Sequence, residues 1–395
     1  MIRFDEALAH VLALARPLEA EQVLLAEANG RVLAAPAVAQ VSAPPADVSV
    51  MDGYAVREAD LATLPATLRI GGESFAGRGH DTPVEPGQCV RIFTGAPVPP
   101  GADRVVMQEQ VRREGDIAMF EAPLSPARFI RRAGSDFGKA DALLAAGTLL
   151  GPRQMVAAAA ADLDRLSVWR RPRLTVLSTG DELARPGTAR ERAQAIPESI
   201  SFGVSALAES WGAEFIGSVI LADRLEDMER AAEQALRDAD IVVVTGGASV
   251  GERDFAKAMF DSQGLELAFS KVAMKPGKPV WFGRAQDRLV LGLPGNPTSA
   301  MVTARLFLAP LIAGLIGRDP QVALRWREME LADALPATGE RETFARGTAE
   351  DVRVWVLPNQ DSGAQRTLAD CDLLVRLAPG THAVKAGSPV DVLDF

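Results

Sequence analysis

Apolar and polar positions repeat with different periods in different parts of this chain. Residues 4–15 carry apolar side chains at helical spacing and end before Pro17, which predicts an N-terminal helix. A second, short helix is predicted near Leu25, and an alanine-rich one over 151–161. Between 46 and 140, short apolar runs alternate with Gly/Pro turns, which is typical of a β-rich insert.

From about residue 172, β-branched or leucine-rich runs alternate with helical patterns, which predicts a doubly wound, mostly parallel α/β domain. The predicted strands are 174–178, 215–221, 241–244, 268–274 and 289–293. The predicted helices are 201–211, 224–239, 253–263 and 297–315. Past residue 319, short alternating runs at 352–356, 373–377 and 390–393 predict a small β domain.

The predicted fold class is thus a multidomain α/β protein. The expected domains are a helical/linker domain (1–45 plus 141–171), a β-rich insert (46–140), the α/β domain (172–318) and a C-terminal β domain (319–395). A net charge of −10 over 395 residues argues against a nucleic-acid partner. The two distant cysteines fit a reducing compartment, and the acidic N-terminus is no signal peptide. The apolar run 306–316 is too short for a bilayer, so we expect a cytoplasmic protein without membrane contact.

Three Gly/Pro-rich loops follow predicted strands and would gather at one sheet edge, where open α/β folds bind ligands. They are Thr179-Gly180-Asp181-Glu182-Leu183, Thr245-Gly246-Gly247-Ala248-Ser249-Val250-Gly251 and Leu293-Pro294-Gly295-Asn296-Pro297. Paired glycines let successive amides face one anion, although a tight turn is the structural alternative. Asn296 and Pro297 suit the first positions of a helix, which explains the third loop equally well.

Lysines and acids give these loops candidate chemistry. On one strand, Lys271 and Lys275 would share a face, and Lys278 follows a Pro-Gly turn; phosphate or oxyanion binding is favoured over solvated charge. Glu182, Asp223 and Asp254 follow predicted strands, with first-turn acids or a helix cap as the structural alternative. Three acids beside three lysines would form a phosphoryl or nucleotidyl site with Mg²⁺.

Taken together, these motifs resemble the molybdopterin molybdenumtransferase family, which includes MoeA-type proteins and the E domain of gephyrin. The matching segments occur in family order over essentially the whole chain. They are Ser49–Ala55, Thr94–Pro97, Arg131–Asp136, Thr179–Leu183, Gly246–Asp254, Lys271–Pro279 and Leu293–Pro297.

The resemblance implies that adenylylated molybdopterin and molybdate react, with Mg²⁺, to give the molybdenum cofactor and AMP. It implies an elongated homodimer with the active site between the α/β domain of one subunit and the Asp52-bearing domain of the other. Molybdopterin adenylyltransferase and apo-molybdoenzymes are further implied partners.

The resemblance also implies roles for particular residues. Implied catalytic positions are Asp52, Glu182, Asp223, Asp254 and Lys275, with Glu182, Asp223 and Asp254 holding the metal. Implied molybdopterin or AMP contacts are Thr94, Arg131, Asp136, Thr179, Gly180, Gly246, Gly247, Ser249, Lys271, Pro294, Gly295 and Asn296. Implied molybdate contacts are Lys275, Lys278, Ser299, Arg341 and Ser362.

Three stretches depart from the family pattern. Ala46-Asp47-Val48-Ser49 stands where the family has Phe-Asp-Asn-Ser, Glu198-Ser199-Ile200 replaces Asp-Ser-Asn, and Gln360-Asp361-Ser362-Gly363 is atypical. These changes leave two alternatives to the enzyme: a non-catalytic molybdopterin or cofactor carrier that docks on a molybdoenzyme, and a hydrolase of another dinucleotide.

Overall fold

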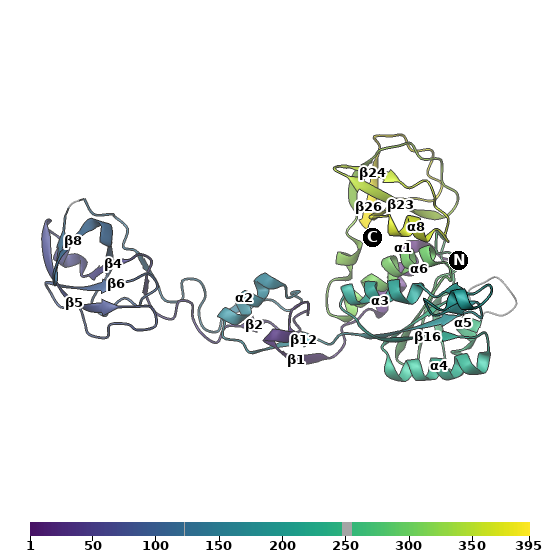
Figure 1. Cartoon of the computed structure of the whole chain (residues 1–395), viewed down its shortest axis with the longest axis horizontal. Coiled ribbons are helices and arrows are strands. Elements are labelled where there is room, and N and C mark those ends of the chain that lie inside the picture. The colour runs from purple at the N-terminus through teal and green to yellow at the C-terminus, as the bar shows by residue number, and fades with distance from the viewer. Residues whose placement is uncertain (122, 247–254) are drawn as a thin grey trace.

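The computed structural model describes residues 1–121, 123–246 and 255–395, and these form an elongated molecule of three lobes (Figure 1). A body holds both chain termini, the α/β domain and the C-terminal domain. A small linker lobe connects this body to a β-rich lobe at the far end, which we call the distal lobe. The chain therefore runs out from the body and returns to it at about residue 172.

A six-stranded sheet forms the centre of the α/β domain. Its strand order is β16 (Glu214–Leu221), β13 (Arg173–Thr179), β17 (Ile241–Thr245), β21 (Arg288–Leu293), β20 (Trp281–Ala285) and β18 (Glu266–Phe269). The first four strands are parallel, and the last two pairings are antiparallel. All five residues of β17 are buried, because a central parallel strand is covered on both faces.

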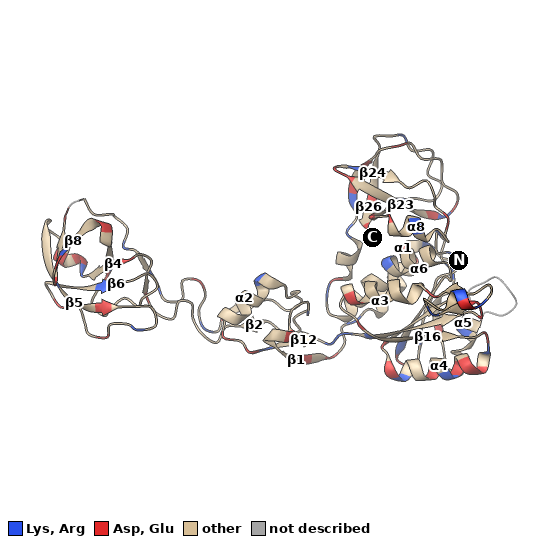
Figure 2. Ribbon diagram, viewed as in Figure 1, with Lys and Arg blue, Asp and Glu red and all other residues tan. Residues whose placement is uncertain are grey.

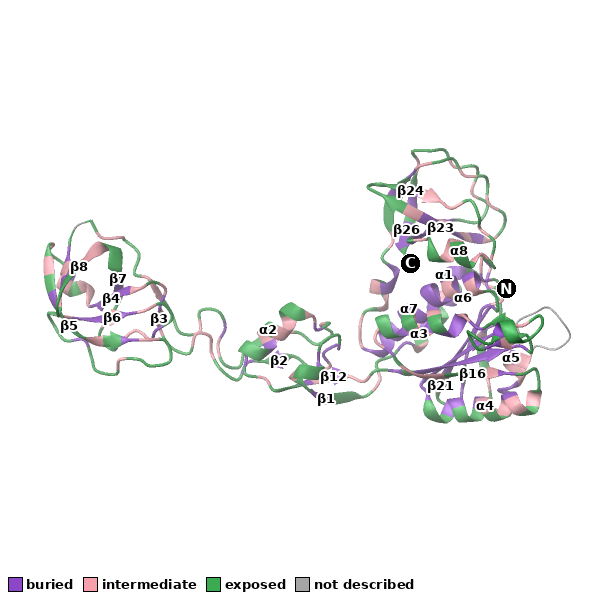
Figure 3. Ribbon diagram, viewed as in Figure 1, coloured by how far each residue is buried: buried purple, intermediate pink, exposed green. Residues whose placement is uncertain are grey.

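Helices cover both faces of this sheet, so its central strands are buried (Figure 3). The first hydrophobic layer includes α3 (Ile200–Ser210) and the continuous helix Pro297–Leu315, formed by α6 (Pro297–Thr303), a π-helical turn (Ala304–Leu308) and α7 (Ala309–Leu315). The second layer includes α4 (Leu225–Asp238) and α5 (Phe255–Ala258). The polar face of α4 carries charges of both signs on the outside (Figure 2).

The predicted strand 268–274 is wrong, because the chain leaves the sheet after Phe269. Met274 and Lys275 instead form β19 (Met274–Lys275), which pairs with the C-terminal domain. Lys271 and Lys275 therefore do not share the face of one strand. The predicted helix 253–263 is also shorter, since α5 ends at Ala258 within the described residues, and a 3-10 turn follows at Asp261–Gln263.

The N-terminal helix α1 (Phe4–Leu14) belongs to the body, which corrects the expected domain of residues 1–45 at this point. Its buried residues Phe4, Ala7 and Val11 lie on one helical face and pack in the first layer of the α/β core. The Phe4 ring lies 5.5 Å from that of Phe307 and 4.9 Å from that of Phe344. This helix thus joins the α/β domain to the C-terminal domain.

The linker lobe and the distal lobe have separate small cores. The linker lobe contains α2 (Pro152–Ala160) and the strand pairs β1 (Ala20–Leu24) with β12 (Arg165–Trp169) and β2 (Ala37–Val38) with β11 (Ala142–Leu144). The helix predicted near Leu25 is a single 3-10 turn, Leu25–Glu27. The distal sheet has the order β7 (Arg104–Met107), β4 (Gly53–Val56), β6 (Gln88–Ile92), β5 (Ala66–Ser74), β9 (Ile117–Phe120) and β8 (Val111–Glu114). A short pair of β3 (Val48–Ser49) with β10 (Ile130–Arg131) adjoins it.

The C-terminal domain is a closed β-barrel with β19 added at its side. Its strands are β23 (Glu342–Glu350), β24 (Arg353–Val356), β22 (Arg327–Leu331), β26 (Pro389–Asp394) and β25 (Leu373–Leu377), and a β23–β25 pairing closes the ring. A short helix, α8 (Gln365–Ala369), lies outside it. The helix Pro297–Leu315 passes a length-and-composition test for a membrane span, but 94% of its most apolar window is buried in the protein.

Candidate active site

The first candidate site, the edge cavity, lies where three parallel strands end. Strand register places Thr245, the last residue of β17, beside Ser178 of β13 and Leu293 of β21. The loops that follow these strands line a cavity of about 780 Å³. Its lining includes Thr179, Gly180, Glu182, Asp223, Thr245, Gly246, Pro294, Gly295 and Asn296. The prediction that these loops gather at one edge of the sheet is confirmed.

Glycines let the loops approach each other closely at the floor of the edge cavity. Gly246 has φ +89°, and a Cβ there would lie 2.4 Å from the backbone oxygen of Thr179. A Cβ on Gly295 would lie 3.3 Å from the Cα of Gly246. The Thr179 hydroxyl donates to the Thr245 backbone oxygen at 3.2 Å. Only glycine therefore fits at position 246 without moving its neighbours.

The acids of the edge cavity crowd each other. The Glu182 carboxylate folds over Gly180, since a Cβ there would lie 2.7 Å from Oε2. The backbone N–H of Asp223 donates to the Asp181 carboxylate at 3.1 Å. Burial raises the pKa of Asp223, and the nearby Asp181 and Glu182 charges raise it further. A divalent cation would relieve this repulsion, so Glu182 and Asp223 fit the role of magnesium ligands beside substrate phosphates.

Glu182 is not a first-turn acid of a helix, and Asp223 is not the N-cap of α4. Glu182 precedes the short strand β14 (Leu183–Ala184) rather than opening a helix. At the start of α4, the N-cap position is Arg224, which makes no capping hydrogen bond with its side chain. Among the described residues no group of three potential metal ligands occurs, and the predicted ligand Asp254 lies outside them, as do Gly247 and Ser249.

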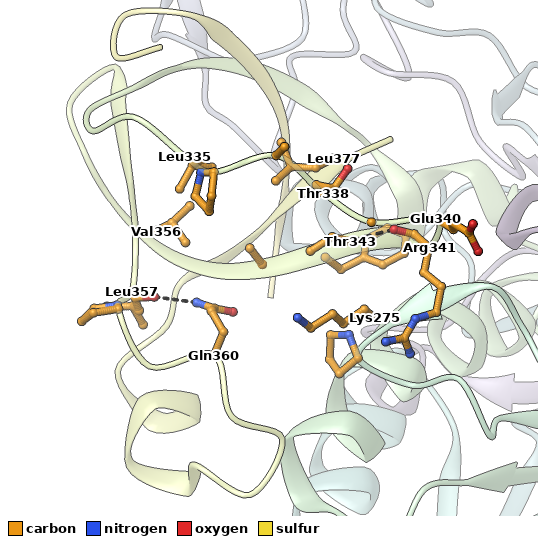
Figure 4. Close-up of a pocket in the computed structure, with 17 residues that line it drawn as sticks. Lys275, Leu335, Thr338, Glu340, Arg341, Thr343, Val356, Leu357, Gln360 and Leu377 are labelled. Carbon is orange, nitrogen blue, oxygen red and sulfur yellow. Dashed lines mark hydrogen bonds between the residues drawn. The ribbon is translucent and has the colours of Figure 1, made fainter. Parts of the chain in front are cut away.

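The second candidate site, the interdomain cavity, lies between the α/β domain and the C-terminal barrel. It has a volume of about 520 Å³, and its lining includes Lys275, Pro276, Arg341 and Gln360. Lys275 extends toward Gln360 across the cavity, and the Arg341 guanidinium lies beyond the other end of the lysine (Figure 4). The remainder of the lining is mixed: Leu335, Val356, Leu357 and Leu377 are apolar, Thr338 and Thr343 are polar, and Glu340 adds one acid. Two cationic groups in one cavity can hold a dianion. The net charge of −10 repels a dianion from the protein as a whole.

The predicted meeting of acids and lysines in one pocket is therefore wrong in the described residues: the structure divides them between two cavities. Two short segments nonetheless border both. Lys275 and Pro276 line the interdomain cavity and Pro279 the edge cavity. In the same way Gln360 lines the interdomain cavity, and Gly363 and Gln365 line the edge cavity. The two cavities are thus neighbours on either side of these segments.

The other implied molybdate residues, and the implied molybdopterin or AMP contacts Asn296 and Lys271, are held in different ways. Asn296 occupies the N-cap position of α6, but its amide donates to the Ser362 hydroxyl at 3.0 Å instead of capping the helix. Ser299 is buried in the first turn of α6. Lys271 and Lys278 are exposed and line neither cavity.

The remaining implied residues lie in the distal lobe. The Asp52 carboxylate accepts hydrogen bonds from the backbone N–H of Thr94 at 2.7 Å and from its hydroxyl at 2.8 Å. The backbone contact, followed by the hydroxyl, lowers the pKa of Asp52. Arg131 and Asp136 are exposed on the same lobe. Within one chain this lobe lies at the opposite end from both cavities (Figure 1).

The departures from the family pattern have local structural explanations. Val48 belongs to β3 and pairs with Arg131 of β10. Glu198 is buried, and its carboxylate accepts from the N–H of Ser201 at 2.8 Å and from its hydroxyl at 2.5 Å, so it fixes the start of α3. Ile200 packs in the first hydrophobic layer while also lining the edge cavity. The Glu198 cap and the buried Arg346 were missed from the sequence, because their partners become visible only in the fold.

Comparisons with known proteins match this architecture over most of the chain. Residues 2–161 match the family described as MoeA N-terminal region (domain I and II), residues 175–314 the probable molybdopterin binding domain, and residues 328–395 the MoeA C-terminal region (domain IV). The chain is 39% identical to a molybdopterin molybdenumtransferase of Haemophilus influenzae over 80% of this chain and 78% of that protein. It is 34% identical to one of Nostoc sp. over 95% of this chain and 89% of that protein.

A solved structure agrees with these relatives. The molybdopterin biosynthesis MoeA protein from Pyrococcus horikoshii OT3 is similar with a TM-score of 0.84 at 27% identity, covering all of both chains. Fold and comparisons thus define a multidomain protein of molybdenum cofactor biosynthesis, whose α/β domain matches the probable molybdopterin binding domain. The chain belongs to the molybdopterin molybdenumtransferase (MoeA) family.

Proposed function

We propose that this chain inserts molybdenum from molybdate into adenylylated molybdopterin and releases AMP. Transfer of molybdenum to molybdopterin is the activity for which the curated relatives are named. The observation that supports the finer reaction is the pair of neighbouring cavities, one lined by the acids Glu182 and Asp223 and the other by the cations Lys275 and Arg341. Carboxylates can hold the Mg²⁺ that binds a pyrophosphate, and cationic side chains can hold an oxyanion directly.

In the proposed reaction, the edge cavity holds the phosphates of adenylylated molybdopterin. Glu182 and Asp223 would hold Mg²⁺, which would neutralise charge on the pyrophosphate that is cleaved. Gly246 and Gly295 permit close approach of the loop backbones. Lys275 and Arg341 hold molybdate in the interdomain cavity by fixed positive charge.

The distal lobe contributes to this site only in a homodimer. The Asp52–Thr94 pair lies far from both cavities of its own chain (Figure 1), so the active site would be completed by Asp52 of the partner subunit. We further propose a cytoplasmic protein, with molybdopterin adenylyltransferase supplying its substrate and apo-molybdoenzymes receiving its product.

The direct test supplies purified protein with adenylylated molybdopterin, molybdate and Mg²⁺ and measures AMP by chromatography. We expect AMP release with stoichiometric cofactor formation, and loss of both in Asp223→Ala. A wild-type protein that releases no AMP contradicts the enzyme. Asp223→Ala protein that still delivers cofactor in cells would favour the carrier.

A mixed dimer tests the shared site. Asp52→Ala and Lys275→Ala each inactivate the homodimer, but a heterodimer of the two keeps one intact site. Random assortment of subunits then predicts recovery of about a quarter of the wild-type activity. Activity no greater than that of the separate variants would show that each chain completes its own site.

A further inference from the structure

The Asp52–Thr94 pair of the distal lobe lies at the ends of two neighbouring strands. Gly53, the first residue of β4, pairs with Ile92, the last residue of β6. Asp52 directly precedes the first of these strands, and Thr94 comes two residues after the second. Both hydrogen bonds from Thr94 reach Oδ1 of Asp52, and Oδ2 accepts none from the described residues. Asp52 therefore uses one carboxylate oxygen within its own lobe and leaves the other for a ligand.

An arginine of β6, Arg91, lies between two aromatic rings beside this pair. Its guanidinium carbon is 5.0 Å from the centroid of the Tyr54 ring and 4.9 Å from that of the Phe93 ring. Tyr54 is buried in the core of the lobe two residues after Asp52, and Phe93 directly precedes Thr94. One cation thus fixes the spacing of the two chain segments that carry the pair.

Hydrogen bonds fix the orientation of the same guanidinium. Nη1 of Arg91 donates to the Gly53 backbone oxygen at 3.1 Å, and Nη2 donates to the side-chain oxygen of Gln108. The backbone N–H of Gln108 donates in turn to the Asp52 backbone oxygen at 3.0 Å. Arg91 thus holds the residue after Asp52 directly and Asp52 itself through Gln108. A lysine has the same charge, but its ammonium cannot stack between two rings and donate in both directions at once.

The stack of side chains continues on the outer side of Phe93. The Phe75 ring lies parallel to it, with the centroids 4.6 Å apart and an interplanar angle of 11°. The guanidinium of Arg78 covers Phe75 at 5.2 Å from the ring centroid. Both faces of Arg91 and both faces of Phe93 are therefore occupied by protein groups. Such a stack offers no free face to a substrate ring, but it gives Asp52 a rigid support.

We propose that Arg91 is a positioning residue that aims the free carboxylate oxygen of Asp52 at the active site of the partner subunit. This inference rests on the proposed function, in which the distal lobe completes the site of the other chain. Arg91 touches no substrate; it fixes the place of Asp52 relative to the rest of its lobe. Because the lobe lies far from both cavities of its own chain (Figure 1), Arg91 affects the reaction and leaves ligand binding in those cavities unchanged.

The test replaces Arg91 by lysine and uses Arg69→Lys as the matched control, since Arg69 is an exposed arginine of the same sheet. Steady-state AMP release gives kcat, and calorimetric titration gives the Kd for AMP and the Kd for molybdate. We expect Arg91→Lys to lower kcat about 10- to 100-fold, because a misplacement of about 1 Å has effects of this size. Both Kd values, and all three values of Arg69→Lys, stay within about twofold of wild type.

A mixed dimer shows on which subunit Arg91 acts. A heterodimer of Arg91→Lys with Lys275→Ala keeps one intact site, whereas a heterodimer of Arg91→Lys with Asp52→Ala keeps none. Random assortment predicts recovery of about a quarter of the wild-type activity in the first mixture only. If Asp52→Ala recovers activity with Lys275→Ala and Arg91→Lys does not, the proposal is overturned.

Hydrogen exchange followed by mass spectrometry separates positioning from damage to the fold. The Thr94 N–H is bound by Asp52, so its exchange reports the place of that carboxylate, while the amides of β4 report the fold of the lobe. We expect Arg91→Lys to exchange about tenfold faster at Thr94 and like wild type in β4. Faster exchange throughout β4, with kcat reduced only in proportion to the folded protein, would show a merely structural role and overturn the proposal.

Folded Arg91→Lys protein with kcat within about twofold of wild type also overturns the proposal. If Arg91→Lys does not fold, Gln108→Ala decides, because it removes the acceptor of Nη2 and leaves the guanidinium between its rings. A fall in kcat of about threefold or more, together with faster exchange at Thr94, supports positioning. Wild-type values of both overturn it.

The exchange measurement also separates this inference from the proposed function. A wild-type protein that releases no AMP contradicts the reaction. In that case Arg91→Lys must still speed exchange at Thr94 about tenfold, since the contact with Asp52 lies within one lobe. Faster exchange then keeps Arg91 as the residue that positions Asp52, and unchanged exchange overturns that role whether or not AMP is released.

Discussion

The edge cavity and the interdomain cavity differ in charge, in origin and in how they were predicted. The edge cavity is built from loops after parallel strands and carries Glu182 and Asp223. The interdomain cavity needs two domains and carries Lys275 and Arg341. The comparison teaches that loops at one sheet edge bring acids together, whereas Lys275 and Arg341 meet, beside Glu340, only where two domains come together. The proposed reaction would use both cavities, one for the metal-bound phosphates and the other for the oxyanion.

The largest effect is expected from Gly246→Ala, which disturbs the close packing of the loops at the edge cavity. The substitution places a Cβ 2.4 Å from the Thr179 backbone oxygen, at a residue whose φ is +89°. We expect a loss of at least about 2 kcal/mol in the free energy of unfolding and at least about 100-fold in AMP release. Chemical denaturation and turnover measure these. Gly264→Ala is the control, because φ is +72° there with no atom within 4 Å of the new Cβ. Equal losses in both variants would show that the approach of the loops is unimportant.

The second prediction concerns Asp223 and pH. Burial, Asp181 and Glu182 raise its pKa, so the charged form is unfavourable in the folded protein. Its contribution to stability is therefore greatest at low pH and falls as the pH rises through the raised pKa. Asp223→Asn should lower kcat about 30- to 100-fold without lowering the melting temperature at neutral pH.

The pH dependence of Mg²⁺ binding checks the same residue. The apparent affinity for Mg²⁺ should weaken at acidic pH, because protonation of the metal-free Asp223 carboxyl, whose pKa is raised, competes with the cation, and Asp223→Asn should lose this dependence. The KM for molybdate should stay unchanged, because Asp223 lines only the edge cavity. Asp238→Asn, in the last turn of α4, is the control. A tenfold change in the molybdate KM of Asp223→Asn would show that the two cavities do not bind their ligands independently.

Lys275→Gln is the reciprocal change in the interdomain cavity. Removing one of two cationic groups should raise the Kd for molybdate about 30-fold and leave the Kd for AMP within about twofold. Calorimetric titration with each ligand measures both. Lys385→Gln, an exposed lysine of the same barrel, is the control. Equal weakening of AMP binding would mean that Lys275 serves both cavities.

Arg341→Lys gives the smallest expected effect. The charge stays, while the contact of the guanidinium with the Met274 backbone oxygen at 3.5 Å is lost. We expect the molybdate KM to rise about threefold. A rise above about 30-fold would indicate that the guanidinium itself binds the oxyanion at two points.

The sequence alone determined the elements and the loops of the α/β domain. The buried runs of β13, β17 and β21, the helices α3 and α4 and the continuous helix Pro297–Leu315 were predicted to within a few residues. For the strands, this is because a covered parallel sheet leaves continuous apolar runs in the sequence. The placement of Glu182 and Asp223 in one cavity followed from the rule that loops after parallel strands meet at one edge.

Only the tertiary structure decided where the remaining parts lie. The helix α1 has the pattern of any amphipathic helix, and its packing against Phe307 and Phe344 depends on residues about 300 positions away. The two-residue strand β19 is too short for a periodic signal, yet it moves Lys275 out of the sheet and into the interdomain cavity. In the sequence, Arg346 resembles any other arginine in a strand. Its burial depends on contacts with the backbone of Asn359 and Asp361, which only the fold supplies. Local periodicity records which face of an element is buried, but not which distant element buries it, because that choice depends on the packing of the whole chain.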